Sequence, residues 1–242
     1  MSRLEWIVLV LCGAGASACQ RHSITTAESQ PKAFGAALVS VSGEKQAAGV
    51  GGLLEQPLVV QVNDAKGAPV AGALVRFAAS GGVRFQPDHG LTGSDGQFSA
   101  GVAVGSLAGR YQIVAYTPDT AGKRAEVRIE EIALGYQERL GQQLSAIHCV
   151  RCHDPESTPE RVSNHDNLNA KPHAFTDGAA LNPISDVNLV AFISHGGAAL
   201  NKSAEMPPYA NRLSKAEIEA LAAYIRAVSD PPYRPQGVFD AN

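Results

Sequence analysis

The sequence predicts a multidomain protein in which an all-β sandwich is followed by an all-α domain. Residues 37–133 contain short apolar segments that alternate with polar positions and are separated by turn residues. From Leu134 onward the apolar residues recur at the three- and four-residue spacing of helices. The chain has 242 residues, 45% of them hydrophobic and 18% charged, which is enough for two globular domains.

Residues 1–18 have the layout of a secretory signal peptide. Arg3 precedes a short apolar run, Trp6–Leu11, and small residues follow up to Cys19. The run is too short to span a bilayer. The segment Ala16–Cys19 also resembles a bacterial lipobox, and this resemblance implies cleavage before Cys19 and diacylation of that cysteine. Ordinary signal cleavage after Ala18, which would give a free periplasmic protein, is the alternative.

Either route exports the chain. Gln20 directly after the cysteine resembles the choice that sorts lipoproteins to the outer membrane. We therefore expect a periplasmic protein that a lipid anchor holds at the outer membrane. Residues 19–36 are polar and small without sustained periodicity, which predicts a flexible tether on the order of 20 to 25 Å in coil dimension.

Residues 37–133 predict about seven short strands. The segments richest in Val, Ile, Phe and Tyr are Leu58–Val62, Ala73–Phe77, Phe98–Val104, Tyr111–Tyr116 and Ala125–Ile129. Turn formers lie between them, at Asn63–Gly67, Ser94–Gly96 and Pro118–Gly122. His89 and the glycines of 49–52 and 81–82 are interpreted as turn and loop residues.

The order VVQVNDAKGAPVAGALVRFAASGG, TGSDGQFSAGV and GSLAGRYQIVAY resembles the invasin-type bacterial immunoglobulin-like domain. The resemblance covers almost the whole of 37–133. It implies an immunoglobulin-like sandwich without catalytic residues that serves as a spacer, a stalk or an adhesive surface.

Three helices are predicted in residues 134–229, and 230–242 form a tail. The first, Leu134–His148, carries Leu140, Leu144 and Ile147 at helical spacing. The second, Asp186–His195, lies between Pro183 and the stop at Gly196–Gly197, with Val187, Val190, Ala191 and Ile193 as its apolar positions. Ser214–Glu217 is a capping box for the third helix, whose buried stripe is Ile218, Leu221, Ala222 and Ile225.

The first helix leads into Cys149-Val150-Arg151-Cys152-His153, the Cys-x-x-Cys-His pattern of c-type haem attachment. Each thiol can add to one vinyl group of the same porphyrin, and His153 then supplies the proximal ligand of the iron. Cys12 and Cys19 lie in the N-terminal segment, so Cys149 and Cys152 are the cysteines left for the folded domains. A short-loop disulfide between them is the alternative, but it leaves His153 unexplained.

Met206 is the candidate distal ligand of that iron. It lies in a proline-flanked loop 53 residues after His153, and Met1 is lost with the signal. A thioether completes a six-coordinate haem iron well, whereas a buried methionine that fills a gap in the core is the alternative. Three histidines are rival ligands, namely His165, His173 and His195.

The C-terminal segment as a whole resembles a class I c-type cytochrome domain. Besides the haem motif it has Gly141, eight residues before Cys149, and the pair Leu221 and Tyr224, positions at which the terminal helices of that family cross closely. Ser145 stands where the family usually has an aromatic residue. The resemblance implies one covalent haem c, and the candidates for its apolar wall are Leu168, Phe175, Leu181, Ile193 and Leu213.

A haem iron with both axial positions filled favours outer-sphere transfer of one electron, so the sequence predicts an exported electron carrier rather than an enzyme. A haem enzyme, or an electron-transfer subunit of a dehydrogenase or oxidase complex, is the alternative, and a surface adhesin is a third possibility. The partners expected are redox proteins and, through Cys19, the membrane. The net charge of −3 shows no strong patch, so no nucleic-acid footprint is present.

Overall fold

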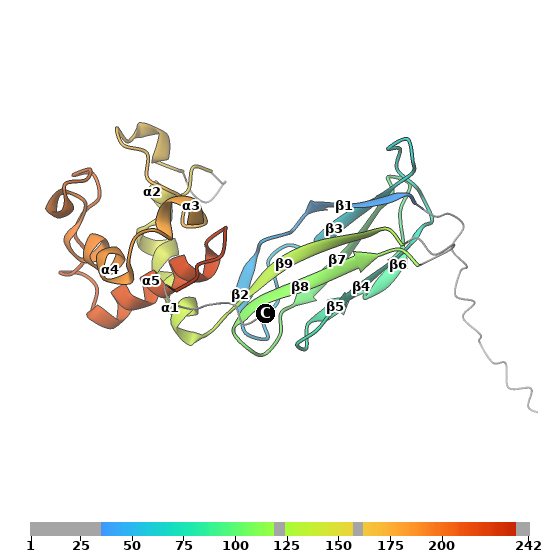
Figure 1. Cartoon of the computed structure of the whole chain (residues 1–242), viewed down its shortest axis with the longest axis horizontal. Coiled ribbons are helices and arrows are strands. Elements are labelled where there is room, and N and C mark those ends of the chain that lie inside the picture. The colour runs from blue at the N-terminus through green and yellow to red at the C-terminus, as the bar shows by residue number, and fades with distance from the viewer. Residues whose placement is uncertain (1–34, 119–123, 157–161, 236–242) are drawn as a thin grey trace, which may run out of the picture. The chain divides into compact units, whose positions relative to one another are not determined.

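The computed structural model describes residues 35–118, 124–156 and 162–235. The described chain contains nine strands followed by helices (Figure 1). This order confirms the predicted fold class, an all-β domain followed by an all-α domain. The predicted signal peptide, Cys19 and most of the tether lie outside the described residues, as do Asp119–Gly122 of the third predicted turn and the end of the predicted tail.

The strands form two sheets. The first has the order β1 (Ala37–Ser42), β3 (Leu58–Asn63), β7 (Gln97–Ala103) and β5 (Arg84–Gln86). The second has the order β2 (Ala47–Gly49), β9 (Glu126–Leu134), β8 (Gly109–Tyr116), β4 (Leu74–Ala79) and β6 (His89–Leu91). Strands β2 and β9 pair in parallel, and the other pairs of strands are antiparallel.

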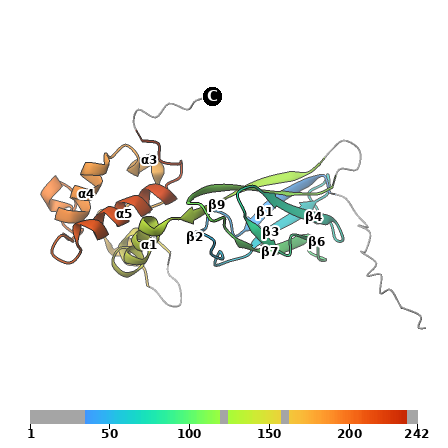
Figure 2. The ribbon, with the colours of Figure 1, turned by 90° about the horizontal axis from the view of Figure 1, so that it is seen from below.

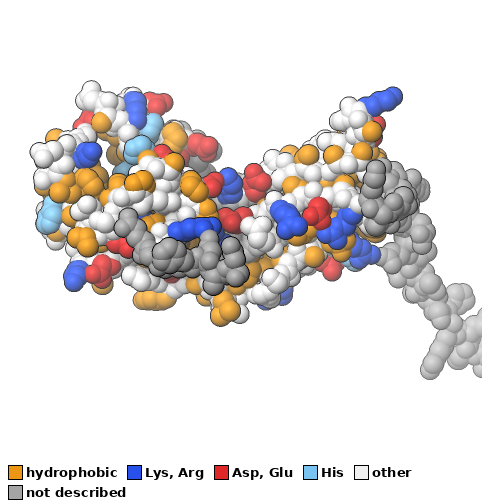
Figure 3. All heavy atoms as spheres, viewed as in Figure 1, with side chains coloured by type: hydrophobic (Ala, Val, Ile, Leu, Met, Phe, Trp, Pro, Cys, Tyr) orange, Lys and Arg blue, Asp and Glu red, His pale blue; other side chains and the backbone are white. Residues whose placement is uncertain are grey.

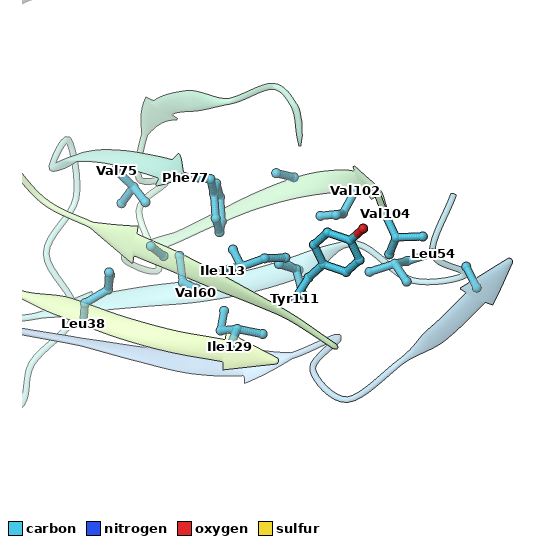
Figure 4. Packing of buried hydrophobic residues seen from close by; sticks show 14 of the residues in the cluster. Leu38, Leu54, Val60, Val75, Phe77, Val102, Val104, Tyr111, Ile113 and Ile129 are labelled. Carbon is cyan, nitrogen blue, oxygen red and sulfur yellow. The ribbon is translucent and has the colours of Figure 1, made fainter. Parts of the chain in front are cut away.

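The core of this domain lies between the two sheets. Leu58, Val60 and Val62 alternate along β3 with half-buried residues, and all three are fully buried. Their side chains belong to the same cluster as Ile113 of β8 and Ile129 of β9 in the opposite sheet (Figure 4). Each such side chain contributes about 1.5 to 3 kcal/mol when it is removed from water, so the period-two pattern is what makes two sheets pack face to face.

Five strands lie where alternation predicts them, and four were not singled out. Of these four, β2, β5 and β6 have three residues each, too few to show a period of two. The interpretation of His89 as a turn residue is wrong, because it begins β6 and is paired with Arg76 of β4. The turn at Ser94–Gly96 is confirmed: the Gly96 N–H donates to Gly93 O, and Gly96 has a positive φ of 72°.

One carboxyl group is buried within the sandwich. Glu131 of β9 has no exposed surface, and its Oε2 accepts a hydrogen bond from the Gln46 N–H at 2.7 Å. Its Oε1 is buried without a hydrogen-bond partner among the described residues. Burial raises the pKa of Glu131 to about 8, because the charged form loses its hydration.

The helical domain contains α1 (Tyr136–His148), α2 (Val150–His153), α3 (Gly178–Leu181), α4 (Asp186–His195) and α5 (Lys215–Val228). All three predicted helices are confirmed, and α2 and α3 are single turns that the sequence did not indicate. The first helix begins at Tyr136 rather than Leu134, because β9 continues to Leu134. The capping box is present: Ser214 and Glu217 each bond the other's backbone N–H.

Helices α1 and α5 lie against each other (Figure 1, Figure 2). Gly141 is buried at the crossing, and a Cβ at this position would lie 2.0 Å from the carbonyl oxygen of Ala220. Ser145, which replaces the usual aromatic residue, is 1% exposed on the same helix. The close crossing predicted from Gly141 and Tyr224 is therefore confirmed, with two small residues of α1 on its buried side.

Two residues predicted for the buried faces of helices are exposed. Ile147 is 73% exposed in the last turn of α1, and Val187 is 79% exposed at the start of α4. Leu189 and Ile193 supply the buried face of α4, so the face is rotated from the one assigned. In contrast, all four residues of the predicted stripe of α5 are buried. No helix within the described ranges is long and apolar enough to cross a membrane.

Candidate haem site

The Cys-x-x-Cys-His pentapeptide folds as a single turn at the end of α1. Cys149 ends α1, with its N–H donating to Ser145 O, and its own carbonyl oxygen accepts the N–H groups of Cys152 and His153 at 3.0 Å. This turn brings two thiols and an imidazole together within five residues. Both cysteines are free thiols and half-buried, so the alternative of a disulfide between them is wrong for this structure. Burial raises the pKa of Cys149 to about 12, which keeps its thiol protonated.

The imidazole of His153 is oriented by a backbone carbonyl. Its Nδ1 lies 2.8 Å from the oxygen of His173, a contact in which Nδ1 carries the hydrogen and donates. The lone pair is then on Nε2, which is the arrangement of a histidine that binds a metal. The ring of Phe175 packs against the imidazole at 4.7 Å between centroids. Burial lowers the pKa of His153, which favours the neutral form that a metal requires.

Met206 lies in the loop between α4 and α5. Its carbonyl oxygen accepts the Gly197 N–H at 3.0 Å, directly after the end of α4. Gly196 has a φ of 75°, and a Cβ there would lie 2.7 Å from the same carbonyl oxygen, so this close approach requires a glycine. The Met206 side chain is half-buried and packs on the same apolar cluster as Cys149. The structure thus brings the predicted distal ligand and the attachment segment to one core.

That cluster supplies most of the predicted apolar wall. Ile193 and Leu213 are buried in it, and Phe175 and Leu181 pack against it. Leu168 is half-buried and is not part of the cluster. Figure 3 shows hydrophobic and histidine side chains together on the visible face of the helical domain.

The rival histidines have other surroundings. The Nδ1 of His165 lies 3.1 Å from Asp166 Oδ1, and the Nδ1 of His173 lies 2.9 Å from Asp177 Oδ2. His195 is exposed in the last turn of α4. His165 and His173 therefore each have a carboxylate partner at Nδ1, and neither belongs to the apolar cluster that holds Met206, whereas His173 contributes its backbone oxygen to His153.

Sequence reasoning missed two residues that hold the Met206 loop. The hydroxyl of Tyr209 donates to the carbonyl oxygen of His148 at 2.9 Å, and its ring meets the His148 ring edge-on at 5.9 Å. The carboxylate of Glu205 accepts hydrogen bonds from Asn169 and Ala170. An aromatic residue shortly after Met206 was a usable signal for Tyr209, whereas no local pattern indicates the partners of Glu205.

The residues present fit a covalently attached haem. Two free thiols next to an imidazole with an available Nε2 are the donors that c-type attachment and proximal ligation require. A thioether on the same apolar cluster supplies a soft donor of the kind that fills the sixth position of a haem iron. The donors come from the α1–α2 turn and from the loop after α4, and the predicted wall residues in the cluster come from α3, from α4 and from the segments that precede α3 and α5.

A comparison with known protein families gives the class of the helical domain. Residues 137–225 match the family model described as cytochrome c oxidase, cbb3-type, subunit III. The helical domain is therefore a cytochrome c-like domain. No curated protein matches the chain.

Solved structures that match the N-terminal part include immunoglobulin-like domains of intimin and invasin, and also a family 2 glycosyl hydrolase from Bacteroides cellulosilyticus. A C-terminal 282-residue fragment of intimin, solved with the intimin-binding domain of its receptor, has 18% identity and a TM-score of 0.32, and the match covers 40% of this chain and 33% of that one. Invasin, described as a bacterial integrin-binding protein, has 21% identity and a TM-score of 0.30, with 40% and 19% covered. The chain therefore spans a third or less of the length of these two structures.

Proposed function

We propose that this protein is a single-haem c-type cytochrome that transfers one electron at a time by an outer-sphere route. The observation that carries the proposal is the turn Cys149–His153, in which both thiols are free and His173 O holds the imidazole with Nε2 available. The match of 137–225 to a cytochrome c family model supports it.

A bound haem would supply reversible one-electron exchange between ferric and ferrous iron. The protein's own residues determine how that exchange proceeds. Cys149 and Cys152 would hold the porphyrin, and His153 and Met206 would both bind its iron, which would leave no position for a substrate. The apolar residues of α4 and α5 exclude water and so keep the reorganisation on electron transfer small. The haem edge would then be the place at which partner redox proteins exchange electrons with this protein.

A second candidate function is that of an electron-transfer subunit in a larger redox complex. The description of the matching family model, subunit III of a cbb3-type oxidase, favours this candidate. In both functions the site is an electron carrier. Catalysis at the haem itself requires an open iron, and ligation by Met206 opposes that.

The test is replacement of Met206 in the haem-loaded protein. We expect the oxidised protein to show a weak sulfur-to-iron charge-transfer band and the reduced protein to resist carbon monoxide. Met206→Ala should abolish the band, admit carbon monoxide and lower the reduction potential, because thioether ligation favours the ferrous state. Met206→His is the matched variant, which should also lose the band but keep the resistance to carbon monoxide. Rapid stoichiometric binding of carbon monoxide by the unchanged protein would overturn the carrier function.

We also propose that the protein acts in the periplasm, anchored to the outer membrane. The predicted signal peptide and lipobox support export to the periplasm and anchoring at the outer membrane through acylated Cys19, with the sandwich as spacer or docking module. Cys19→Ser should abolish fatty-acid labelling and move the protein to the soluble fraction, because stable anchoring requires two or more acyl chains. Unchanged membrane association of the variant would contradict the anchor.

A further inference from the structure

The carboxylate of Glu205, the residue before Met206, joins two segments that are far apart in the sequence. It accepts the Asn169 N–H at 3.1 Å, the Asn169 Nδ2–H at 3.0 Å and the Ala170 N–H at 3.3 Å. These partners lie 35 and 36 residues earlier in the chain. The carboxylate also accepts the hydroxyl of Ser203 at 3.2 Å, a contact within its own loop.

The segment that Glu205 holds is the one that orients His153. Three residues after Ala170, the carbonyl oxygen of His173 accepts the hydrogen bond from His153 Nδ1. Lys171, between them, donates to the carbonyl oxygens of Asp166 at 2.7 Å and Leu168 at 2.9 Å, which folds the segment onto itself. One carboxylate therefore connects the segment that orients the candidate proximal ligand with the loop that carries the candidate distal ligand.

The remaining contacts of the Met206 loop show why this connection matters. The Met206 carbonyl oxygen accepts the Gly197 N–H, and the hydroxyl of Tyr209, three residues later, donates to His148 O. Both contacts attach the loop to α4 and α1. Glu205 attaches it to the 168–173 segment, and hydrogen bonds to an ionised carboxylate are stronger than those between neutral groups.

We propose that Glu205 is a positioning residue that holds the Met206 loop closed, and so determines how firmly the thioether stays bound to the iron. The inference rests on the proposed function, because it assumes ligation by Met206. A thioether is a weak neutral ligand, so an external ligand enters whenever the loop opens. The rate of entry then reports the fraction of time that the loop is open.

The experiment uses the full-length haem-loaded protein and imidazole as the probe. We expect Glu205→Ala to bind imidazole in the ferric state faster by about fivefold or more, to weaken the charge-transfer band and to lower the potential. Glu205→Gln keeps an acceptor oxygen for the backbone N–H groups. Its rate of imidazole binding should therefore lie between the rates of the unmodified protein and of Glu205→Ala. Glu219→Ala removes an exposed carboxylate of α5 that pairs with Lys215 at 3.7 Å, and it should leave all three readouts unchanged.

Two further variants keep the inference falsifiable if Glu205→Ala folds poorly. Glu205→Asp keeps the charge but draws it back by one methylene group from Asn169, and it should behave like the alanine variant. Ser203→Ala removes only the contact within the loop and should bind imidazole at the original rate. Original imidazole binding by a folded Glu205→Ala or Glu205→Asp variant would overturn the inference, as would a Ser203→Ala rate equal to that of Glu205→Ala.

The proposed function fails separately from this inference. If the unmodified protein lacks the charge-transfer band and binds carbon monoxide freely, Met206 is not a ligand of the iron and both proposals are wrong. If the unmodified protein shows the band and the Glu205 variants bind imidazole at the same rate as that protein, the proposed function stands and only the positioning role of Glu205 is wrong.

Discussion

Replacement of Gly141 by alanine is expected to destabilise the helical domain. Gly141 lies where α1 crosses α5, and an added Cβ would be 2.0 Å from Ala220 O and 2.7 Å from Tyr224 Cβ. Real Cβ atoms essentially never come within 3.0 Å of such neighbours, so the two helices must separate by roughly 1 Å. The obstacle at Ala220 is a backbone atom, which cannot rotate away as a side chain can.

Two effects of opposite sign determine the size of the change. Alanine stabilises a helix interior relative to glycine by about 1 kcal/mol. Overpacking of a well-packed core costs about 1 to 3 kcal/mol, and this contact belongs at the upper end because separation also loosens Leu144 and Leu221, which are 8% and 1% exposed. We therefore expect a net loss of about 2 kcal/mol in the free energy of unfolding. Because α1 delivers Cys149, the haem content of the purified protein should fall as well.

Urea denaturation followed by circular dichroism and by haem absorbance measures this loss. Ala146→Gly is the matched control, because Ala146 is exposed on the same helix, and it should lose about 1 kcal/mol through helix propensity alone. Equal or greater stability of Gly141→Ala would refute the reasoning, because it would show that helix propensity outweighs the crossing.

Three further predictions concern the haem, the domains and the buried carboxyl group. Acid-acetone extraction should leave haem on the polypeptide, as seen by intact mass, and replacing Cys149 and Cys152 together should abolish this; release of all haem from the unchanged protein would contradict covalent attachment. A fragment Leu134–Asn242 with a secretory signal should mature with the full-length haem spectrum, because the apolar cluster that holds Cys149 and Met206 contains no residue of the sandwich; failure to bind haem would show that the sandwich contributes to the site. Burial raises the pKa of Glu131 in the folded protein from 4.5 to about 8. The folded state therefore keeps the stability that the protonated carboxyl group gives it below about pH 4.5 and loses that stability as the pH rises to 8. The free energy of unfolding should fall over this range by on the order of 3 to 5 kcal/mol. Glu131→Gln should remove that slope in urea titrations of the sandwich, and an unchanged slope would disprove the assignment.

Much of the fold follows from local patterns. The five alternating segments are strands, because a period of two separates a buried face from an exposed face within one strand. The helix α5 begins after its capping box and buries its predicted stripe, because both signals act within one or two turns. The buried faces predicted for α1 and α4 are wrong at Ile147 and Val187, which are exposed. Which side of a helix is buried depends on where the neighbouring helices lie, and the local sequence does not determine that.

The candidate haem site was likewise only partly predictable from the sequence. The sequence by itself indicated the turn Cys149–His153 as the candidate attachment site, because five consecutive residues carry that chemistry, and Met206 as the candidate distal ligand. Only the tertiary structure decided what holds these groups: His173 O on His153, Asn169 on Glu205 and His148 O on Tyr209. These contacts join residues that are 20, 36 and 61 positions apart, and two of the three acceptors are backbone carbonyl oxygens. Every residue has such an oxygen, so the choice of acceptor leaves no mark in the sequence and is made only when the helices pack.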